Sequence, residues 1–161
     1  QPALDGHDMG LMSEAGMPAI ADPGSSVVRA AHDLGVQVVP LTGPMSLMLA
    51  LASTGLNGQN FAFVGYLPQD AGERTQRIRE LESLALKTGQ TQIFIETPYR
   101  NTALLGALLQ TMNGNTRLAL SCGLTLEAAW SRSALVSAWK SRRDEKPAPP
   151  LGLPTVFCIG R

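Results

Sequence analysis

The chain has 161 residues, which is enough for one compact domain or two small lobes. Hydrophobic residues make up 44% and charged residues 16%, and the formal net charge is zero. Zero net charge argues against a protein that depends on nucleic-acid electrostatics alone, although it leaves room for a local basic patch.

The sequence also limits location and metal chemistry. No apolar run reaches the ~18 residues that a membrane span needs, and residues 1–8 lack the basic start and apolar stretch of a signal peptide. We therefore expect a cytoplasmic protein without membrane association. Cys122 and Cys158 lack metal-type spacing, and His7 and His32 stand far apart, so we expect reduced core thiols and no metal. The chain lacks an initiator methionine and is expected to be a piece of something larger.

The amino-terminal part predicts a strand, an exposed loop and a helix, in that order. Residues 9–12 form a short apolar segment, followed by two turn signals, Gly-Met-Pro and Asp-Pro-Gly. A helix is expected over 25–34 and a buried strand over 36–41. Ligands of an open α/β sheet bind beyond the carboxyl ends of strands, so the loop that carries Glu14 is a candidate ligand loop.

The rest of the chain alternates apolar runs of strand length with helical patterns. Strands are expected over residues 61–67, 91–96, 117–121 and 155–159, with a further short strand over 126–130. Helices are expected from Pro44 to Gly55, from Asp70, from Pro98 and over 133–142. Residues 146–154 are rich in proline and predict an irregular loop.

Two of these helices carry local signals that make sharper predictions. Pro44 is expected at a first helical position, and the apolar residues after it surround the helix on every side, which predicts burial all round. In the next helix, Asp70 with Glu73 predicts a capped start. Its expected apolar stripe consists of Ile78, Leu81 and Leu84.

The alternation of strands and helices predicts an α/β fold. The segment Leu-Thr-Gly-Pro at residues 41–44 separates a first lobe, 1–42, from a second lobe, 43–161. We expect the second lobe to be a mixed sheet of about five strands flanked by four helices. The first lobe holds about two strands and one helix, which is too little to bury a sheet, so we expect it to be incomplete.

The candidate sites are loops at strand ends, because the sequence has no GxGxxG, GxxxxGK[ST] or GxSxG motif. Glu96 ends an apolar strand, where a carboxylate needs a partner, and Arg100 is the nearest one. A purely structural ion pair is an equal alternative. The helix start at Gly43, Pro44 and Ser46 offers free amides to an anion, with a plain helix cap as the alternative.

Basic residues form a second, weaker candidate. Seven basic residues could form a basic rim or simply the solvated faces of helices, and the second interpretation is the more common. They are Arg74, Arg77, Arg79, Lys140, Arg142, Arg143 and Lys146. Aromatic residues are few, so no base-stacking platform of the single-strand-binding type is visible.

Four segments together resemble a known family. In chain order they are Ser-Glu-Ala-Gly-Met-Pro-x-x-x-Asp-Pro-Gly, Val-Val-Pro-Leu-Thr-Gly-Pro-Met-Ser, Gly-Tyr-Leu-Pro and Phe-Ile-Glu-Thr-Pro-Tyr-Arg. In this order and spacing the chain resembles the tetrapyrrole methylase family of S-adenosylmethionine-dependent methyltransferases. Within it, the likeness is to the ribosomal small-subunit RNA 2′-O-methyltransferase I branch. It covers nearly the whole chain, from about Gly10 onward.

The resemblance implies two α/β lobes with S-adenosylmethionine in the cleft between them, and a homodimer. The implied cofactor contacts are Glu14, Ala15, Gly16, Met17, Pro18, Gly43, Pro44, Ser46, Tyr66, Leu124 and Thr125. Glu96 and Arg100 are implied to face the cleft. They are our catalytic candidates, because a ribose hydroxyl needs a base or a polarising cation to help remove its proton.

Departures from the family pattern leave the acceptor open. The ribosomal branch usually has Asp-Ala-Gly-Thr-Pro at residues 14–18 and Glu-Ser-Pro-His-Arg at 96–100, and the family's first strand and cofactor loop are absent. The first hypothesis is methyl transfer to ribosomal RNA. The second is C-methylation of a tetrapyrrole in corrin or siroheme synthesis. The third is a dimerising, substrate-binding lobe without catalysis of its own.

Overall fold

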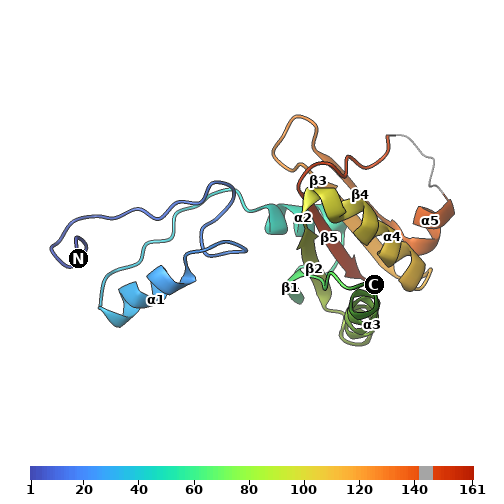
Figure 1. Cartoon of the computed structure of the whole chain (residues 1–161), viewed down its shortest axis with the longest axis horizontal. Coiled ribbons are helices and arrows are strands. Elements are labelled where there is room, and N and C mark those ends of the chain that lie inside the picture. Colours follow the sequence, from blue (N-terminus) through green and yellow to red (C-terminus); the bar gives the residue numbers. More distant parts are fainter. Residues whose placement is uncertain (142–146) are drawn as a thin grey trace. The chain divides into compact units, whose positions relative to one another are not determined.

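The structure is a computed structural model of the chain that describes residues 1–141 and 147–161 (Figure 1). The chain forms two compact units, Gln1–Met45 and Ser46–Arg161. The second contains a five-stranded mixed sheet flanked by helices, which confirms the predicted α/β fold class. Three residues of the predicted basic rim, Arg142, Arg143 and Lys146, lie outside the described residues.

The first unit contains a single helix, α1 (Ser25–Asp33), which confirms the helix predicted over 25–34. The strands predicted over 9–12 and 36–41 are wrong, since neither segment of this fully described unit is extended against a neighbour. Strands depend on hydrogen bonds to a partner strand, and the five strands found in residues 1–141 and 147–161 pair only with one another. Without such a partner Met12 is left 89% exposed.

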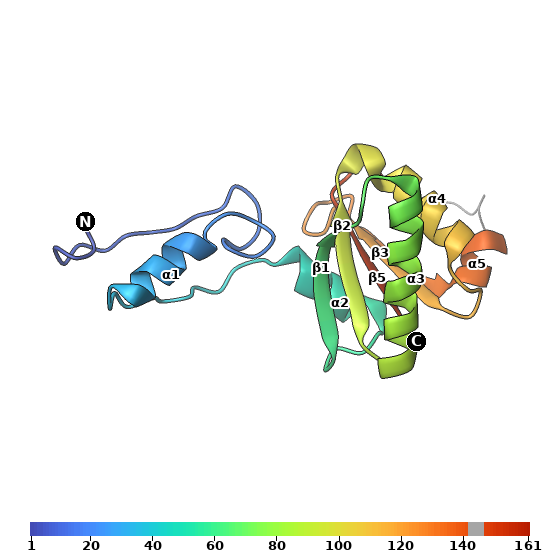
Figure 2. The ribbon, with the colours of Figure 1, turned by 60° about the horizontal axis from the view of Figure 1, so that its bottom comes forward.

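The second unit is built on a sheet of strand order β1-β2-β5-β3-β4 (Figure 2). The strands are β1 (Phe61–Tyr66), β2 (Thr91–Glu96), β3 (Arg117–Cys122), β4 (Trp130–Leu135) and β5 (Thr155–Gly160). β1 and β2 are parallel, whereas the other three pairs are antiparallel. The last strand of the chain, β5, therefore occupies the middle of the sheet.

Helices cover both faces of this sheet (Figure 2). They are α2 (Ser46–Thr54), α3 (Ala71–Thr88), α4 (Asn101–Thr111) and α5 (Val136–Ser141), with a 3-10 turn at Pro98–Arg100. α3, α4 and α5 enclose the main core, in which the rings of Phe94 and Phe157 stack with centroids 5.8 Å apart. α2 lies on the opposite face, against β5, β3 and β4.

Contacts at its carboxyl end give the direction of α2. Ser53 Oγ lies 3.1 Å from Ser121 Oγ, and Ser121 is paired with Val156 near the start of β5. Leu56, just after the helix, covers Gly160 at the end of β5, where an added Cβ would lie 2.9 Å from Leu56 Cδ2. α2 therefore runs in the direction of β5, and its amino end at Ser46 points to the edge of the sheet where β5 begins.

Two predictions for α2 are wrong. The helix begins at Ser46, so Pro44 precedes it and does not occupy its first turn. Burial is also one-sided: Leu47 and Leu51 are buried against the sheet, whereas Leu49 is 42% exposed. A single sheet face covers only one side of a helix, and among the described residues of the second unit the side that carries Leu49 is left exposed.

The start of α3 agrees with its prediction, but one member of its stripe does not. Asp70 Oδ1 accepts a hydrogen bond of 2.9 Å from the Glu73 amide, which confirms the predicted cap. Ile78 and Leu81 are buried, whereas Leu84 is exposed and Ala85 is buried in its place. The step of seven residues from Ile78 to Ala85 is close to two full turns, which keeps Ala85 on the core side.

The other predicted strands agree with the structure to within one residue, except near β4. The strand predicted over 126–130 and the helix predicted over 133–142 are wrong, because β4 spans Trp130–Leu135 and α5 begins only at Val136. β4 pairs with β3 along its whole length, from Trp130 opposite Cys122 to Leu135 opposite Arg117. The Val136 amide then donates to Thr116 O, which starts α5 directly after the strand.

Candidate functional site at one edge of the sheet

The carboxyl ends of β1, β2 and β3 meet the start of β5 at one edge of the sheet. Thr155 at the start of β5 is paired with Glu96 on one side and with Cys122 on the other. Tyr66, at the end of β1, is paired with Ile95 of β2. We call the segments 66–68, 96–101, 123–126 and 151–155 the site edge. Neighbouring strands lie about 4.8 Å apart, so these four strand ends span roughly 15 Å.

The site edge therefore brings several predicted site residues onto one side of the second unit. Tyr66, Glu96, Arg100, Leu124 and Thr125 all lie in its segments. The amino end of α2, which carries Ser46, points to the same edge. Their roles as cofactor or catalytic residues stay predictions.

Glu96 and Arg100 form the predicted ion pair. Glu96 Oε1 accepts hydrogen bonds from Arg100 Nε at 3.0 Å and from Thr97 N at 2.7 Å, and it lies 2.8 Å from Arg100 Nη2. The 3-10 turn between the two residues brings the guanidinium back over the end of β2. The Glu96 side chain is 3% exposed, whereas that of Arg100 is 26% exposed.

This geometry gives the two side chains different capacities. Glu96 Oε1 is occupied by four donors, two from Thr97 and two from Arg100, so the carboxylate holds Arg100 in place. Arg100 Nη1 donates to no residue that the structure describes, and it remains available to an acceptor outside the unit. Of the two, Arg100 is the group that a substrate can reach.

Both tyrosines of the chain lie at the site edge and are exposed. Tyr66 is 58% and Tyr99 79% exposed. Tyr66 follows a break in the register between β1 and β2, where Gly65 adopts a φ of 74°, a left-handed conformation that glycine adopts without strain. Tyr99 lies under Arg100, whose Cζ is 5.2 Å from the ring centroid.

The segment after β3 turns sharply at the site edge. Gly123 has a φ of 58°, and a Cβ added there would lie 2.7 Å from Leu153 Cδ1. The Gly123 amide donates to Pro154 O at 2.8 Å, which ties this turn to the segment before β5. Leu124 is half-buried, and Thr125 is exposed with a φ of 73°. Thr125 thus presents backbone as well as side chain to solvent.

Sequence reasoning missed the residue that holds this edge together. Asn101 is completely buried at the start of α4, and its Nδ2 donates to Leu151 O at 2.9 Å and to Leu153 O at 3.0 Å. Asn101 Oδ1 is buried without a hydrogen-bond partner among the described residues. The only sequence signal for this role is that an asparagine directly follows Arg100. Its hydrogen-bond partners lie about fifty residues further along the chain, where the sequence pattern does not reveal them.

The Cys122 thiol at the site edge is unreactive. Burial raises the pKa of Cys122, and a hydrogen bond with Thr155 opposes part of that rise. A thiol that stays protonated is a poor nucleophile. Cys122 therefore acts as a core residue, as predicted.

The predicted cofactor residues of the first unit lie in loops. Glu14, Ala15 and Gly16 are exposed, with Ser13 Oγ donating to Ala15 O at 2.9 Å, and Met17 and Pro18 are half-buried. Gly43 and Pro44 are exposed in an extended segment. The loop predicted over residues 14–18 is confirmed, whereas Gly43 and Pro44, predicted to open a helix, lie before its start. That they contact the same ligand as the site edge stays a prediction.

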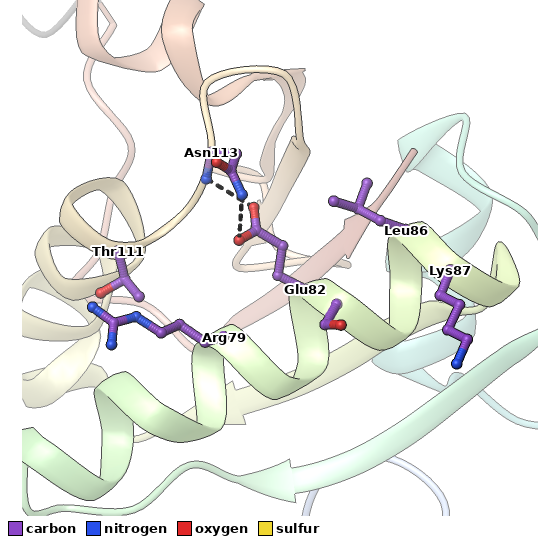
Figure 3. Close-up of a pocket in the computed structure, with 7 residues that line it drawn as sticks. Arg79, Glu82, Leu86, Lys87, Thr111 and Asn113 are labelled. Carbon is purple, nitrogen blue, oxygen red and sulfur yellow. Dashed lines mark hydrogen bonds between the residues drawn. The ribbon is translucent and has the colours of Figure 1, made fainter.

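An open hollow lies at the other end of the sheet, between the second half of α3 and the end of α4 (Figure 3). It is lined by Arg79, Glu82, Ser83, Leu86, Lys87, Thr111 and Asn113. Glu82 accepts hydrogen bonds from Asn113 N at 2.8 Å, from Asn113 Nδ2 at 3.1 Å and from Thr116 Oγ1. Its carboxylate joins α3 to the turn before β3, so the polar contacts of this hollow are structural.

Two searches of the described residues gave negative results. Residues 1–141 and 147–161 contain no group of three His, Cys, Asp or Glu side chains that could hold a metal ion. No helix in the same part of the chain is long and apolar enough to cross a membrane.

Comparison with known proteins relates the chain to named enzymes. It is 37% identical over 120 residues to ribosomal RNA small subunit methyltransferase I of Mesorhizobium japonicum, an alignment that covers 74% of this chain and 40% of that protein. Over 122 residues it is 36% identical to the Vibrio cholerae protein of the same name, with coverages of 76% and 41%. These similarities support the resemblance to the tetrapyrrole methylase family that the sequence motifs indicate. It spans about two fifths of the length of these curated relatives.

Solved structures agree with this resemblance at the level of the fold. The crystal structure of the methyltransferase CobJ superposes with a TM-score of 0.61 and 16% identity, over 99% of this chain and 67% of that one. At such low identity the likeness shows the shared fold alone. No protein-family model matches the chain.

Proposed function

We propose that this chain works in an S-adenosylmethionine-dependent methyltransferase that acts on ribosomal RNA. The observation that carries the proposal is its identity of 36–37% to relatives named ribosomal RNA small subunit methyltransferase I. Because the chain spans only about two fifths of their length, the activity of the whole protein is part of the proposal. The homodimer and the cytoplasmic location implied by the family resemblance belong to it as well.

The residues of the site edge fit one side of the proposed cofactor. S-adenosylmethionine, when bound, supplies a methyl group on a positively charged sulfur. Tyr66 presents an exposed aromatic ring, which attracts a cation, and the exposed turn at Thr125 presents backbone groups. Ser46 begins a nine-residue helix whose free amides suit a carboxylate. We assign the remaining contacts to residues 14–18, Gly43 and Pro44, and to Leu124.

Within this proposal Arg100 acts on the acceptor and Glu96 holds Arg100. A ribose hydroxyl gives up its proton to water as it takes the methyl group, and a cation placed in advance stabilises the negative charge that this proton loss leaves on the oxygen. Arg100 has a free Nη1 and an exposed surface at the site edge. Glu96 as a general base is the alternative, but four donors already occupy its Oε1.

The other two hypotheses from the sequence remain as rivals. A tetrapyrrole C-methyltransferase shares the fold, but the likeness to CobJ at 16% identity gives no argument about the acceptor. A dimerising, substrate-binding lobe without catalysis is the rival of another class. Each predicts a different outcome in one set of assays.

The test measures transfer of labelled methyl groups from S-adenosylmethionine to small ribosomal subunits and, separately, to uroporphyrinogen. We expect transfer to the subunits, a fall in turnover of at least tenfold for Arg100→Ala, and nearly unchanged cofactor affinity by calorimetry. Arg79→Ala is the matched control, because Arg79 lies beside the hollow at the other end of the sheet. Transfer to uroporphyrinogen alone would establish the tetrapyrrole rival, and binding without any transfer would favour the non-catalytic lobe.

A further inference from the structure

The ring of Tyr99 is exposed at the site edge apart from its contact with the Arg100 guanidinium. It is 79% exposed, in a fold whose other large aromatic side chains are mostly packed into the core or against the sheet. Tyr99 follows Pro98 in the turn after β2, so its backbone is fixed while its ring reaches into solvent. Exposing a large aromatic ring leaves apolar area in water, and such rings often mark a contact surface.

One side of this ring is already covered by a fixed cation. Arg100 Cζ lies 5.2 Å from the ring centroid, and the ion pair with Glu96 holds the guanidinium there. The high exposure of Tyr99 leaves the rest of the ring open. An aromatic ring held against an immobile guanidinium is rigid, so a flat partner can stack on it with little loss of side-chain freedom.

Charge indicates which flat partner the second unit suits. The zero net charge of the chain hides an uneven distribution: residues 46–161 contain twelve Lys and Arg against eight Asp and Glu, whereas residues 1–45 contain one against five. A basic unit attracts a polyanion. Single-stranded RNA combines phosphates with flat bases that stack on aromatic and guanidinium planes.

We propose that Tyr99 is the stacking platform for an unpaired nucleobase of an RNA substrate, with Arg100 next to it at the neighbouring phosphate or ribose. This inference rests on the proposed function and names a residue that positions its acceptor. It also revises the expectation that the chain shows no base-stacking platform. A single tyrosine at the site edge supplies the platform that composition alone did not reveal.

The test is binding of a short, fluorescently labelled single-stranded oligoribonucleotide, compared with an abasic strand of equal length. The protein is the full chain, alone and with S-adenosylmethionine. We expect Tyr99→Leu to weaken binding of the oligoribonucleotide by about tenfold, because stacking on one aromatic ring contributes roughly that much. Tyr99→Phe keeps the ring and should bind normally. Leu84→Ala, which alters an exposed apolar residue of α3, is the control.

Two results would overturn the inference. In the first, Tyr99→Leu binds the oligoribonucleotide as tightly as the unaltered protein, or loses the abasic strand to the same extent. In the second, Tyr99→Leu loses affinity for S-adenosylmethionine and keeps RNA binding, which would place the cofactor on this ring. Failure of the proposed function is a separate result, because it appears as a lack of methyl transfer by the unaltered protein.

Discussion

The Glu96–Arg100 pair makes a prediction whose size follows from its geometry. Oε1 of Glu96 accepts from Arg100 Nε at 3.0 Å, lies 2.8 Å from Nη2 and accepts from Thr97 N at 2.7 Å. Glu96→Gln keeps an acceptor but removes the charge. The hydrogen bond from Thr97 N then changes from a charge-assisted one, of about 1.5–3 kcal/mol, to a neutral one of about 0.5–1.5 kcal/mol, and the two Arg100 contacts lose the attraction between opposite charges. Arg100 is partly exposed, so solvent screening reduces the coupling of the pair to about 1–2 kcal/mol.

A double-mutant cycle measures this coupling directly. The four proteins are the unaltered chain, Glu96→Gln, Arg100→Met and the double variant, each unfolded with urea. Tryptophan fluorescence reports the second unit specifically, because both tryptophans, Trp130 and Trp139, belong to it. A coupling energy below about 0.3 kcal/mol would be within the range of independent sites, and it would refute the account of Arg100 as a residue held by Glu96.

Three further predictions concern stability and reactivity. Glu82→Ala should lower the free energy of unfolding by about 3 kcal/mol in a urea titration, since it leaves the buried hydroxyl of Thr116 and two donors of Asn113 without their acceptor; a loss near zero would show that water replaces the carboxylate. Gly123→Ala should cost about 1–3 kcal/mol in thermal unfolding, because φ is 58° and the added Cβ meets Leu153; an unchanged melting temperature would contradict this. Burial raises the pKa of Cys158 to about 12 from an ordinary value of 9.0, so its thiol should resist alkylation until the chain unfolds. The unfolded chain forms the Cys158 thiolate at a lower pH than the folded chain does, so the free energy of unfolding should fall as the pH rises from 9 toward 12. The unaltered chain should lose more stability over this range than Cys158→Ala, and an equal or smaller loss would contradict that sign.

How far the fold could be predicted depended on where each element finds its partner. β2 was predicted with its observed bounds, because an apolar, β-branched run between turn signals needs little more than its own pattern. β4 was misplaced because Trp-Ser-Arg-Ser-Ala-Leu reads equally well as the side of a helix, and pairing with β3 decides against that. The strands predicted over 9–12 and 36–41 failed because no strand in the described part of the chain pairs with them.

The same difference between local contacts and distant partners decides which parts of the candidate site could be predicted. The contact between Glu96 and Arg100 was predictable, since a spacing of four residues across a turn keeps the two side chains within reach. The direction of the Tyr99 ring was not, because it depends on where the turn at 98–100 leaves the sheet. The role of Asn101 was equally hidden, because its acceptors, Leu151 O and Leu153 O, come from a loop far along the chain.

The central place of β5 bears on how the second unit is made. β1 pairs with β2 and β3 with β4, but only the final strand, Thr155–Gly160, joins these two ribbons into one sheet. During synthesis both ribbons leave the ribosome with an open inner edge, and an unpaired edge can join a strand of another chain. The nascent protein is therefore most exposed to misassembly while these two inner edges are out of the ribosome and β5 is not.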